Sequence, residues 1–321
     1  FRHFYLKIVF FNKKYAFYHI KLDRFDLQIL SALLDNCRES DRQIGSKIGI
    51  SGAAVKSRIK KLIKNKTIGN FALKIEPPVL GHNVLYIVTT GQDIDQILKQ
   101  VELIGEPFFV VPCVGGITVC AIVVKENVTQ KIELAKNLMR DVRILSIFEA
   151  ENPGIRSDLT KTDVEIINQL LKNPRVKIDD MSKKTKLSTK TIARSLKKLQ
   201  NDEAIQFTLI YDPAKFGQYI PFAVLVWVDG NLNETLKLLK TGFSTSFLQK
   251  PFIAKNQIVL FLHSNNIFEL DNITQQVRKI SGVASADLFI PKKITFPQKW
   301  VIDAIRASKA STKLHLMYQT N

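Results

Sequence analysis

The sequence predicts an α+β protein in which two winged helix-turn-helix domains alternate with two ferredoxin-like βαββαβ domains. Three observations predict this architecture. The chain has 321 residues, which exceeds the size of one average domain. Residues 22–68 align without a gap on residues 159–205. Each of these repeats has a helical pattern, and each is followed by a segment in which strand and helix patterns alternate.

The repeat is defined by identical residues at apolar helix positions and at helix ends. With one residue removed, the match extends into the following strand and turn. A duplication within the gene is the simplest explanation, because self-similarity at a fixed offset is typical of a repeated fold. Identical pairs include Leu22/Leu159, Asp26/Asp163, Ile29/Ile166, Leu33/Leu170, Arg38/Arg175, Ser51/Ser188, Leu62/Leu199, Phe71/Phe207, Pro77/Pro213 and Gly81/Gly217.

The first repeat begins with two predicted helices that carry N-terminal caps. Asp23 can cap a helix that runs to about Asn36, whose leucines recur at the spacing of one buried face. A second, short helix begins after Ser40, where Ser40 and Gln43 form a capping box. Gly49 then ends this helix.

A third helix follows the tight turn, and this arrangement predicts a helix-turn-helix. Ser51 caps the helix in the first repeat and Ser188 caps it in the second. After Gly69 an alternating apolar pattern predicts a strand, which we expect to form the wing hairpin. The inward residues are Val55, Ile59, Leu62 and, in the second repeat, Ile192, Leu196, Leu199; the strand is marked by Phe71, Leu73 and Ile75.

The segments after the repeats predict the βαββαβ order of a ferredoxin-like sandwich. The first segment should contain a strand at 84–90, a helix at 93–103, two strands joined at Gly115-Gly116, a helix at 128–140 and a strand at 142–148. The second segment repeats this order, with strands near 222–228, 247–254, 257–263 and 286–290.

These patterns divide the chain into domains. The winged helix-turn-helix domains are predicted at 21–81 and 159–217, and the βαββαβ domains at 82–152 and 218–296. Asn152-Pro153-Gly154 breaks both patterns, which predicts a linker at 153–158. Residues 297–321 are expected to form a C-terminal helix and tail. Residues 1–20 precede every pattern, and we interpret them as a spurious upstream extension.

Positive charge is concentrated in the two repeats. The chain carries a net charge of +18; residues 21–75 carry +7 and residues 159–215 carry +5, whereas residues 76–158 carry −4. This balance favours a polyanionic partner, either nucleic acid such as double-stranded DNA or an anionic membrane face, and charge alone does not choose between them. No apolar run reaches the length of about twenty residues that a membrane helix needs, so no membrane partner is expected. Cys37, Cys113 and Cys120 lack metal or disulfide spacing, so we expect no metal and a reducing, cytoplasmic location.

These residues resemble the Lrp/AsnC, or feast/famine, family of bacterial and archaeal regulators. The resemblance rests on Leu-Asp-x-x-Asp at 22–26, on Ser-x-x-x-Val-x-x-Arg-Ile-x-x-Leu at 51–62, and on a wing that ends in Pro77 and Leu80-Gly81. It implies a DNA-binding transcription regulator, in which a helix-turn-helix domain is joined to a dimerising regulatory domain of RAM type that often binds an amino acid. No cofactor and no catalytic residue is expected.

Two departures from the family pattern bear on function. Ser195 stands where the first repeat has Arg58, and Arg194 lies one position earlier. The family's Gly-x-x-Asp segment is only half present, and the missing acid argues against a free amino acid as the effector. The candidate effector residues are Gly115, Gly116 and Thr118, the last standing in place of the acid.

The third helix of each repeat is the predicted DNA reader. A helix of this size fits the major groove, while lysines on its flanks neutralise phosphates. We assign base-edge or groove-floor contacts to Gly52, Ala53, Lys56, Ser57, Thr189, Lys190, Ala193 and Arg194. We assign phosphate contacts to Arg58, Lys60, Lys61, Lys74, Lys197 and Lys198. In the alternative, these lysines only solvate a helix face and Arg58 pairs with a carboxylate of its own domain.

The sequence leaves assembly and two other functions open. The regulatory domains pair either within one chain, as a pseudo-dimer with two unlike readers, or between chains, as a homo-oligomer. The other functions are a siroheme-decarboxylase-like enzyme on the same fold and a non-specific chromatin-like DNA-binding protein. The histidines, His82 and His263 among them, are scattered, and no phosphate loop or nucleophile motif occurs, which disfavours an enzyme.

Overall fold

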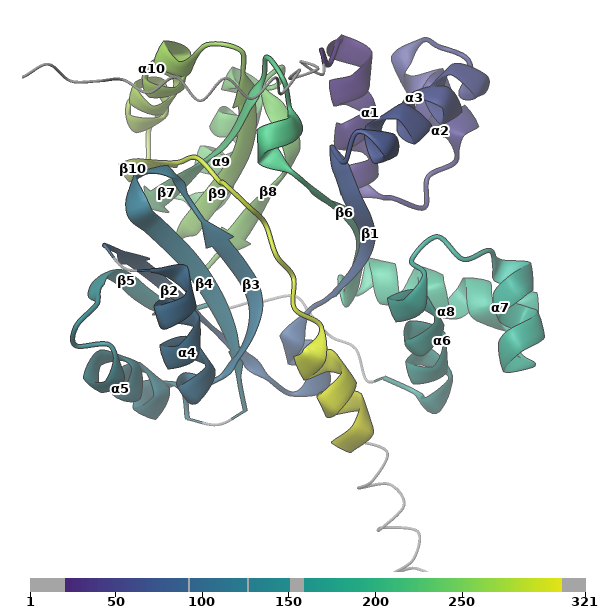
Figure 1. Cartoon of the computed structure of the whole chain (residues 1–321), viewed down its shortest axis with the longest axis horizontal. Helices are drawn as coiled ribbons and strands as arrows, with labels where there is room; N and C mark the ends of the chain where they lie inside the picture. The colour runs from purple at the N-terminus through teal and green to yellow at the C-terminus, as the bar shows by residue number, and fades with distance from the viewer. Residues whose placement is uncertain (1–20, 92, 126, 151–158, 308–321) are drawn as a thin grey trace, which may run out of the picture.

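The computed structural model describes residues 21–307, except residues 92, 126 and 151–158. The expectations for residues 1–20, for the breaker and linker at 152–158 and for the tail beyond residue 307 therefore lie outside the described residues. Within them the elements follow the predicted order. The α+β fold with two helix-turn-helix units and two ferredoxin-like units is confirmed (Figure 1).

Each helical unit is a bundle of short helices whose starts follow local capping signals. The predicted capping side chains Asp23, Ser40, Ser51 and Ser188 all accept a hydrogen bond from a backbone N–H of the first turn. The first unit comprises α1 (Arg24–Asp35), α2 (Asp41–Ile48) and α3 (Gly52–Lys64). The second unit comprises α6 (Lys161–Lys172), α7 (Ile178–Thr185) and α8 (Thr189–Asn201).

The strand after each helical unit pairs with its counterpart from the other unit. β1 (Ile68–Ile75) and β6 (Ile205–Tyr211) form an antiparallel two-stranded sheet, the strand pair, in which Ala72 faces Thr208. The expected wing hairpin within each unit is wrong, because the strand finds its partner in the other repeat. A single strand leaves backbone donors and acceptors unpaired, and the duplicated strand satisfies them.

Two four-stranded antiparallel sheets form the body of the molecule, each with helices on one face (Figure 1). The strand orders are β3-β4-β2-β5 and β10-β7-β9-β8, which is the ferredoxin-like order in both cases. The first sheet contains β2 (Asn83–Thr90), β3 (Glu106–Pro112), β4 (Ile117–Val124) and β5 (Arg143–Glu149), with α4 (Ile94–Ile104) and α5 (Val128–Leu138). The second contains β7 (Ile220–Val228), β8 (Phe247–Ala254), β9 (Gln257–Ser264) and β10 (Val283–Phe289), with α9 (Leu232–Gly242) and α10 (Ile267–Arg278). Short 3-10 turns are η1 (Pro77–Leu80), η2 (Val114–Gly116) and η3 (Pro213–Lys215).

The faces of the two sheets that carry no helix meet each other, and we call this contact the seam. Tyr86 of the first sheet lies 5.9 Å, centroid to centroid, from the ring of Phe252 of the second sheet. Phe148 lies 6.1 Å from Trp227 in the same way. After β10, residues 290–296 form a strap that leaves the second sheet and pairs with the edge of β3, where Val110 and Thr295 exchange backbone hydrogen bonds.

Each helical unit packs against the sheet of the other half. The first unit shares a core with Leu248 of β8, and Lys250 of β8 pairs with Asp35 of α1 at 2.6 Å. The second unit shares a core with Phe108 and Ala121 of the first sheet. That core also holds the C-terminal helix at residues 299–307 through Trp300, Val301 and Ile305. The crossing of β1 and β6 causes this exchange, since each strand carries the chain to the opposite side. Among the described helices, none combines the length and apolar character that crossing a bilayer requires.

Candidate nucleic-acid interface

The turn between the second and third helix of each unit brings the two helices close together. In the first unit a Cβ on Gly45 would lie 2.5 Å from the carbonyl oxygen of Ile50, so no larger side chain fits without a shift. In the second unit Ser182 takes this place, and its hydroxyl donates a hydrogen bond to the carbonyl of Leu187 at 2.6 Å. The turn is thus closed by backbone contact in one unit and by a side-chain hydrogen bond in the other.

The residues that end the second helix adopt the same left-handed backbone in both units. Gly49 has a φ of 80°, and Lys186 stands at the equivalent position with a φ of 59°. Glycine enters this region freely, whereas a residue with a Cβ is strained there. The turn geometry is therefore kept in the second unit at some cost in stability.

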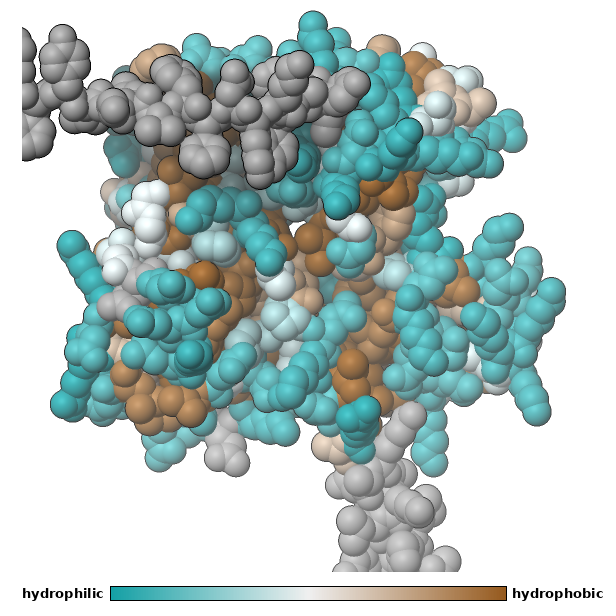
Figure 2. Space-filling model, in the orientation of Figure 1, coloured by the Kyte–Doolittle hydropathy of each residue, from teal (hydrophilic) through white to brown (hydrophobic). Residues whose placement is uncertain are grey.

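The outer faces of α3 and α8 expose most of the predicted reader residues. The exposed members are Ala53, Lys56, Ser57, Lys60 and Lys61 on α3, and Thr189, Lys190, Ala193, Arg194 and Lys197 on α8. Hydrophilic side chains predominate on the visible surface of the second helical unit, whereas the first unit also shows apolar side chains (Figure 2). Both units project on the same side of the two sheets, joined by the strand pair (Figure 1).

Arg58 is held by carboxylates of its own unit, as the alternative interpretation predicted. Its Nη1 atom lies 2.8 Å from a carboxylate oxygen of Asp23 and 2.8 Å from one of Asp26, which is 1% exposed. The hydrogen bonds that Arg58 donates to Asp26 and Asp23 raise the pKa of Arg58. These contacts favour the structural alternative over the assigned phosphate role, because the guanidinium neutralises a buried acid.

The second unit neutralises the equivalent buried acid with different residues. Ser195 donates a hydrogen bond to Asp163, and Lys198 Nζ lies 3.1 Å from the same carboxylate. Burial alone would raise the pKa of Asp163, but the hydrogen bonds from Ser195, Thr160 and Lys198 hold it below its ordinary value. Ser195 and Lys198 together replace Arg58, which explains the departure from the family motif; the phosphate role of Lys198 stays a prediction.

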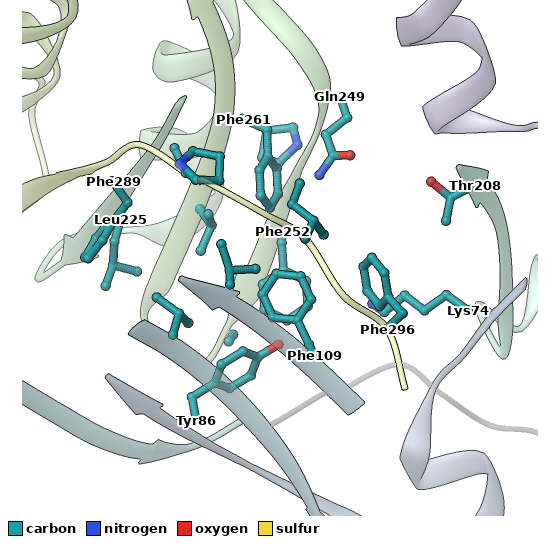
Figure 3. Close-up of a pocket in the computed structure, with 18 of the residues that line it drawn as sticks. Lys74, Tyr86, Phe109, Thr208, Leu225, Gln249, Phe252, Phe261, Phe289 and Phe296 are labelled. Carbon is teal, nitrogen blue, oxygen red and sulfur yellow. The ribbon is translucent and has the colours of Figure 1, made fainter. Parts of the chain in front are cut away.

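Two further assigned residues lie in other surroundings. Lys74 belongs to β1 and faces the seam rather than the outer face of a helix, and its Nζ atom lies 2.6 Å from Glu76 and 5.3 Å from the ring centroid of Phe252 (Figure 3). This position disfavours the phosphate role assigned to Lys74. Gly52 opens α3 against α2, where a Cβ would lie 3.1 Å from the Cα atom of Arg42, so this glycine permits close helix packing.

The structure also shows exposed basic residues and an interdomain contact that the sequence interpretation did not assign. Lys64, Lys183 and Lys184 are exposed on the same helical units, and the basic composition of the repeats was the signal for them. Arg38 donates hydrogen bonds from Nη1 to the carbonyls of Pro174 and Val176, at 2.6 and 2.8 Å. Arg38 therefore joins the two helical units, although the sequence marked it only as a repeated residue.

The candidate effector residues and histidines do not form one site. Gly115 and Gly116 are exposed in the turn between β3 and β4, whereas Thr118 is buried. His82 is buried and contacts the carbonyl of Leu80, and His263 packs against Tyr219; burial lowers the pKa of both histidines. Within the part of the chain that the structure describes, no His, Cys, Asp and Glu side chains gather in a group that could hold a metal.

Comparison with known protein families matches both helical units. The model of the AsnC-type helix-turn-helix domain matches residues 22–63, and the model of a winged helix-turn-helix DNA-binding domain matches residues 159–206.

The HTH-type transcriptional regulator Ptr1 of Methanocaldococcus jannaschii is 36% identical over 98 residues, which are 26% of this chain and 66% of that protein. LrpA of Pyrococcus horikoshii is 29% identical over 89 residues, which are 28% of this chain and 63% of that protein. The chain spans between about half and two thirds of the length of the curated relatives that it matches.

Solved structures give weaker likenesses. The siroheme decarboxylase NirDL covers 89% of this chain, with all of its own chain aligned, at 12% identity and a TM-score of 0.47. AsnC of E. coli covers 43% of this chain, with 98% of its own chain aligned, at 19% identity and a TM-score of 0.30.

The fold and the family models define a class: the chain is a helix-turn-helix protein with two such units in one polypeptide. The first unit matches the AsnC-type family model, and the chain is similar to the transcription regulator Ptr1.

Proposed function

We propose that this protein is a sequence-specific DNA-binding transcription regulator that places two unlike readers on one asymmetric duplex site. The observation that carries the proposal is the position of the basic faces. In both units they lie on the exposed side of the helix that follows the tight turn, and both units project on one side of the molecule. A helix presented in this way can enter a major groove while neighbouring lysines contact phosphates.

The two readers differ at the positions that would meet base edges. Gly52, Ala53, Lys56 and Ser57 of α3 correspond to Thr189, Lys190, Ala193 and Arg194 of α8. Because each position carries a different side chain, the two halves of the bound site should differ in sequence. This difference also favours a regulator over a non-specific chromatin-like protein, whose contacts would be the same for all duplexes.

We further propose that one chain does the work of a dimer. The strand pair, the seam and the exchanged packing of the helical units supply within one chain the contacts that two subunits would otherwise make. A DNA-binding regulator acts in the compartment that holds the chromosome, which agrees with the reducing, cytoplasmic location expected from the cysteines. Light scattering on the purified protein tests this assembly. The mass of one chain would support pairing within the chain. A mass of two or more chains at all concentrations would show that pairing is between chains, and a dimer would then carry four readers.

The walls of the seam argue against the enzymatic alternative. A tetrapyrrole with several carboxylates needs several free cations, but Lys74 pairs with Glu76 and Lys250 pairs with Asp35, each at 2.6 Å. His82 and His263 do not line the cavity in the seam. A tetrapyrrole absorbance band in the purified protein would reverse this argument.

The direct test is selection of bound fragments from genomic DNA, followed by a competition measurement at fixed salt. The expected result is that the selected duplex binds at least about a hundredfold tighter than a shuffled duplex of the same composition, since specific and non-specific affinities of DNA regulators differ by about 10³–10⁷. Equal binding of both duplexes would support the chromatin-like function, and no binding at low salt would exclude the proposed function.

A further inference from the structure

A cavity of about 250 Å³ lies in the seam between the two sheets. Tyr86 and Phe109 line it from the first sheet, Leu225 and Phe261 line it from the second, and Phe296 of the strap lies along another side (Figure 3). An engineered apolar cavity of about 150 Å³ can hold benzene. The cavity in the seam is therefore large enough for a compact molecule with two fused rings.

The cavity wall contains a buried polar group that lacks a partner. Gln257 is 2% exposed, and its side-chain oxygen Oε1 has no hydrogen-bond partner among the described residues. Such a group is unfavourable in a folded protein, and a molecule that hydrogen-bonds with the amide would remove the penalty. Gln257 therefore points to a ligand with one polar group on an otherwise apolar body.

The charged groups near the cavity indicate that this ligand is uncharged. Lys74 is paired with Glu76, and Lys250 is paired with Asp35. Burial raises the pKa of Tyr86 well above its ordinary value, so its hydroxyl stays neutral. The remaining wall is formed mainly by aromatic and aliphatic side chains, which favour the face or edge of an aromatic ring.

We propose that the seam binds a compact, uncharged aromatic molecule whose single hydroxyl or amine group hydrogen-bonds with the amide of Gln257. No described feature of the turn at Gly115 and Gly116 takes part, so this site is separate from the candidate effector residues. A ligand here also touches the strand pair, because Lys74 of β1 and Thr208 and Tyr211 of β6 line the same cavity. Binding should therefore change how the two helical units are held and alter DNA affinity; this second part rests on the proposed function.

Calorimetric titration of the intact chain without DNA tests the site with 2-naphthol and naphthalene as probes. These molecules have the same ring system, and only 2-naphthol can hydrogen-bond with Gln257. Both should bind the natural protein. In Gln257→Leu, the affinity ratio of 2-naphthol to naphthalene should fall about fivefold, which corresponds to the loss of one net hydrogen bond. An unchanged ratio would exclude the amide as the polar contact.

A cavity-filling pair of variants locates the binding. Val259→Trp places a large side chain in the cavity wall, whereas Leu238→Trp adds the same group at a position that is 47% exposed on α9. The first variant should lose at least tenfold in affinity for both probes, and the second should bind as the natural protein does. If Val259→Trp does not fold, a crystal structure of the natural protein soaked with 2-naphthol decides, since density outside the seam overturns the proposal. Absence of binding by both probes also overturns it.

Fluorescence anisotropy with the selected duplex tests the coupling. Saturating 2-naphthol should change DNA affinity at least threefold in the natural protein and leave it unchanged in Val259→Trp. A protein that binds 2-naphthol but keeps its DNA affinity would contradict the coupling alone. A protein that binds 2-naphthol and no DNA would refute the proposed function and leave the ligand site standing.

Discussion

The guanidinium carbon of Arg38 lies 5.2 Å from the centroid of the Phe207 ring, and the equivalent residue Arg175 lies 4.7 Å from the centroid of Phe71. Arg38 and Arg175 are repeat partners, and so are Phe71 and Phe207. The contact is therefore reciprocal, as in an interface between two identical subunits. The register of the strand pair agrees, since Ala72 faces its own repeat partner Thr208.

The two arginines of this interface should contribute unequally to stability. Arg38→Ala removes two hydrogen bonds to carbonyls as well as the ring contact, whereas Arg175→Ala removes the ring contact and a longer ion pair to Asp41 at 3.7 Å. We expect Arg38→Ala to lower the free energy of unfolding by about 3–6 kcal/mol, because hydrogen bonds from charged groups contribute about 1.5–3 kcal/mol each and two are lost. The loss in Arg175→Ala should be about 1 kcal/mol. Denaturant titration measures both, with the exposed Arg42→Ala as control; equal losses in the first two variants would contradict this ranking.

Lys56 and Lys61 should affect DNA binding in different ways. Both are exposed on α3, but Lys56 lies near the start of the helix and Lys61 near its end. Lys56→Ala should reduce the preference for the selected duplex by a free energy of about 1–3 kcal/mol, as a lost base contact does. Lys61→Ala should weaken all duplexes alike and reduce the slope of log affinity against log salt by about one. Anisotropy titrations at several salt concentrations measure both effects, and equal loss of affinity with unchanged preference in both variants would refute the division of roles.

Asp163 should make the stability of the second helical unit depend on pH in the acidic range. Its pKa is lower in the folded protein than in the unfolded chain, because its hydrogen bonds to Ser195, Thr160 and Lys198 outweigh the effect of burial. The ionised group therefore adds stability above the unfolded pKa of about 3.9, and this contribution is lost as the pH falls through the folded pKa. We expect Asp163→Asn to be less stable than the natural protein at pH 7, with the gap closing below pH of about 4. A gap that is constant from pH 7 to pH 3 would show that the charge of Asp163 is unimportant.

The residue that ends the second helix has a left-handed backbone in both units but is glycine in one and lysine in the other. Exchanging the two residue types tests the cost of a Cβ at this position. Lys186→Gly should raise the free energy of unfolding by about 0.5–1 kcal/mol, because glycine removes the strain at a φ of 59°. Gly49→Lys should lower it by a similar amount, since Gly49 has a φ of 80° and nothing lies within 4 Å of a Cβ placed there. Thermal denaturation of both variants measures the changes. The two variants must change the free energy of unfolding in opposite directions. Stabilisation by Gly49→Lys would contradict the prediction and show that the backbone is free to relax.

Local signals in the sequence predicted most elements because their causes lie within a few residues. Ser40 and Gln43 cap α2 by contacts inside one turn, and the predicted strand at 247–254 matches β8. The exposed reader residues could be predicted from helix periodicity alone. The sequence offered an ion pair within its own domain as one alternative for Arg58, but neither its partner Asp26 nor the contact of Lys74 with Phe252 could be identified, because both partners lie far away in the sequence.

The sequence by itself determined the duplicated architecture, the helix caps and the basic outer faces of α3 and α8, since all of these follow from short-range pattern and charge. Only the tertiary structure decided which strand pairs with which, because β1 has the same hydrogen-bonding groups toward any partner and the choice of β6 depends on the packing of the whole chain. The same holds for the seam. The cavity and the unpartnered side-chain oxygen of Gln257 lie where two sheets that are distant in sequence meet. The pattern of a single strand does not predict the shape of that contact.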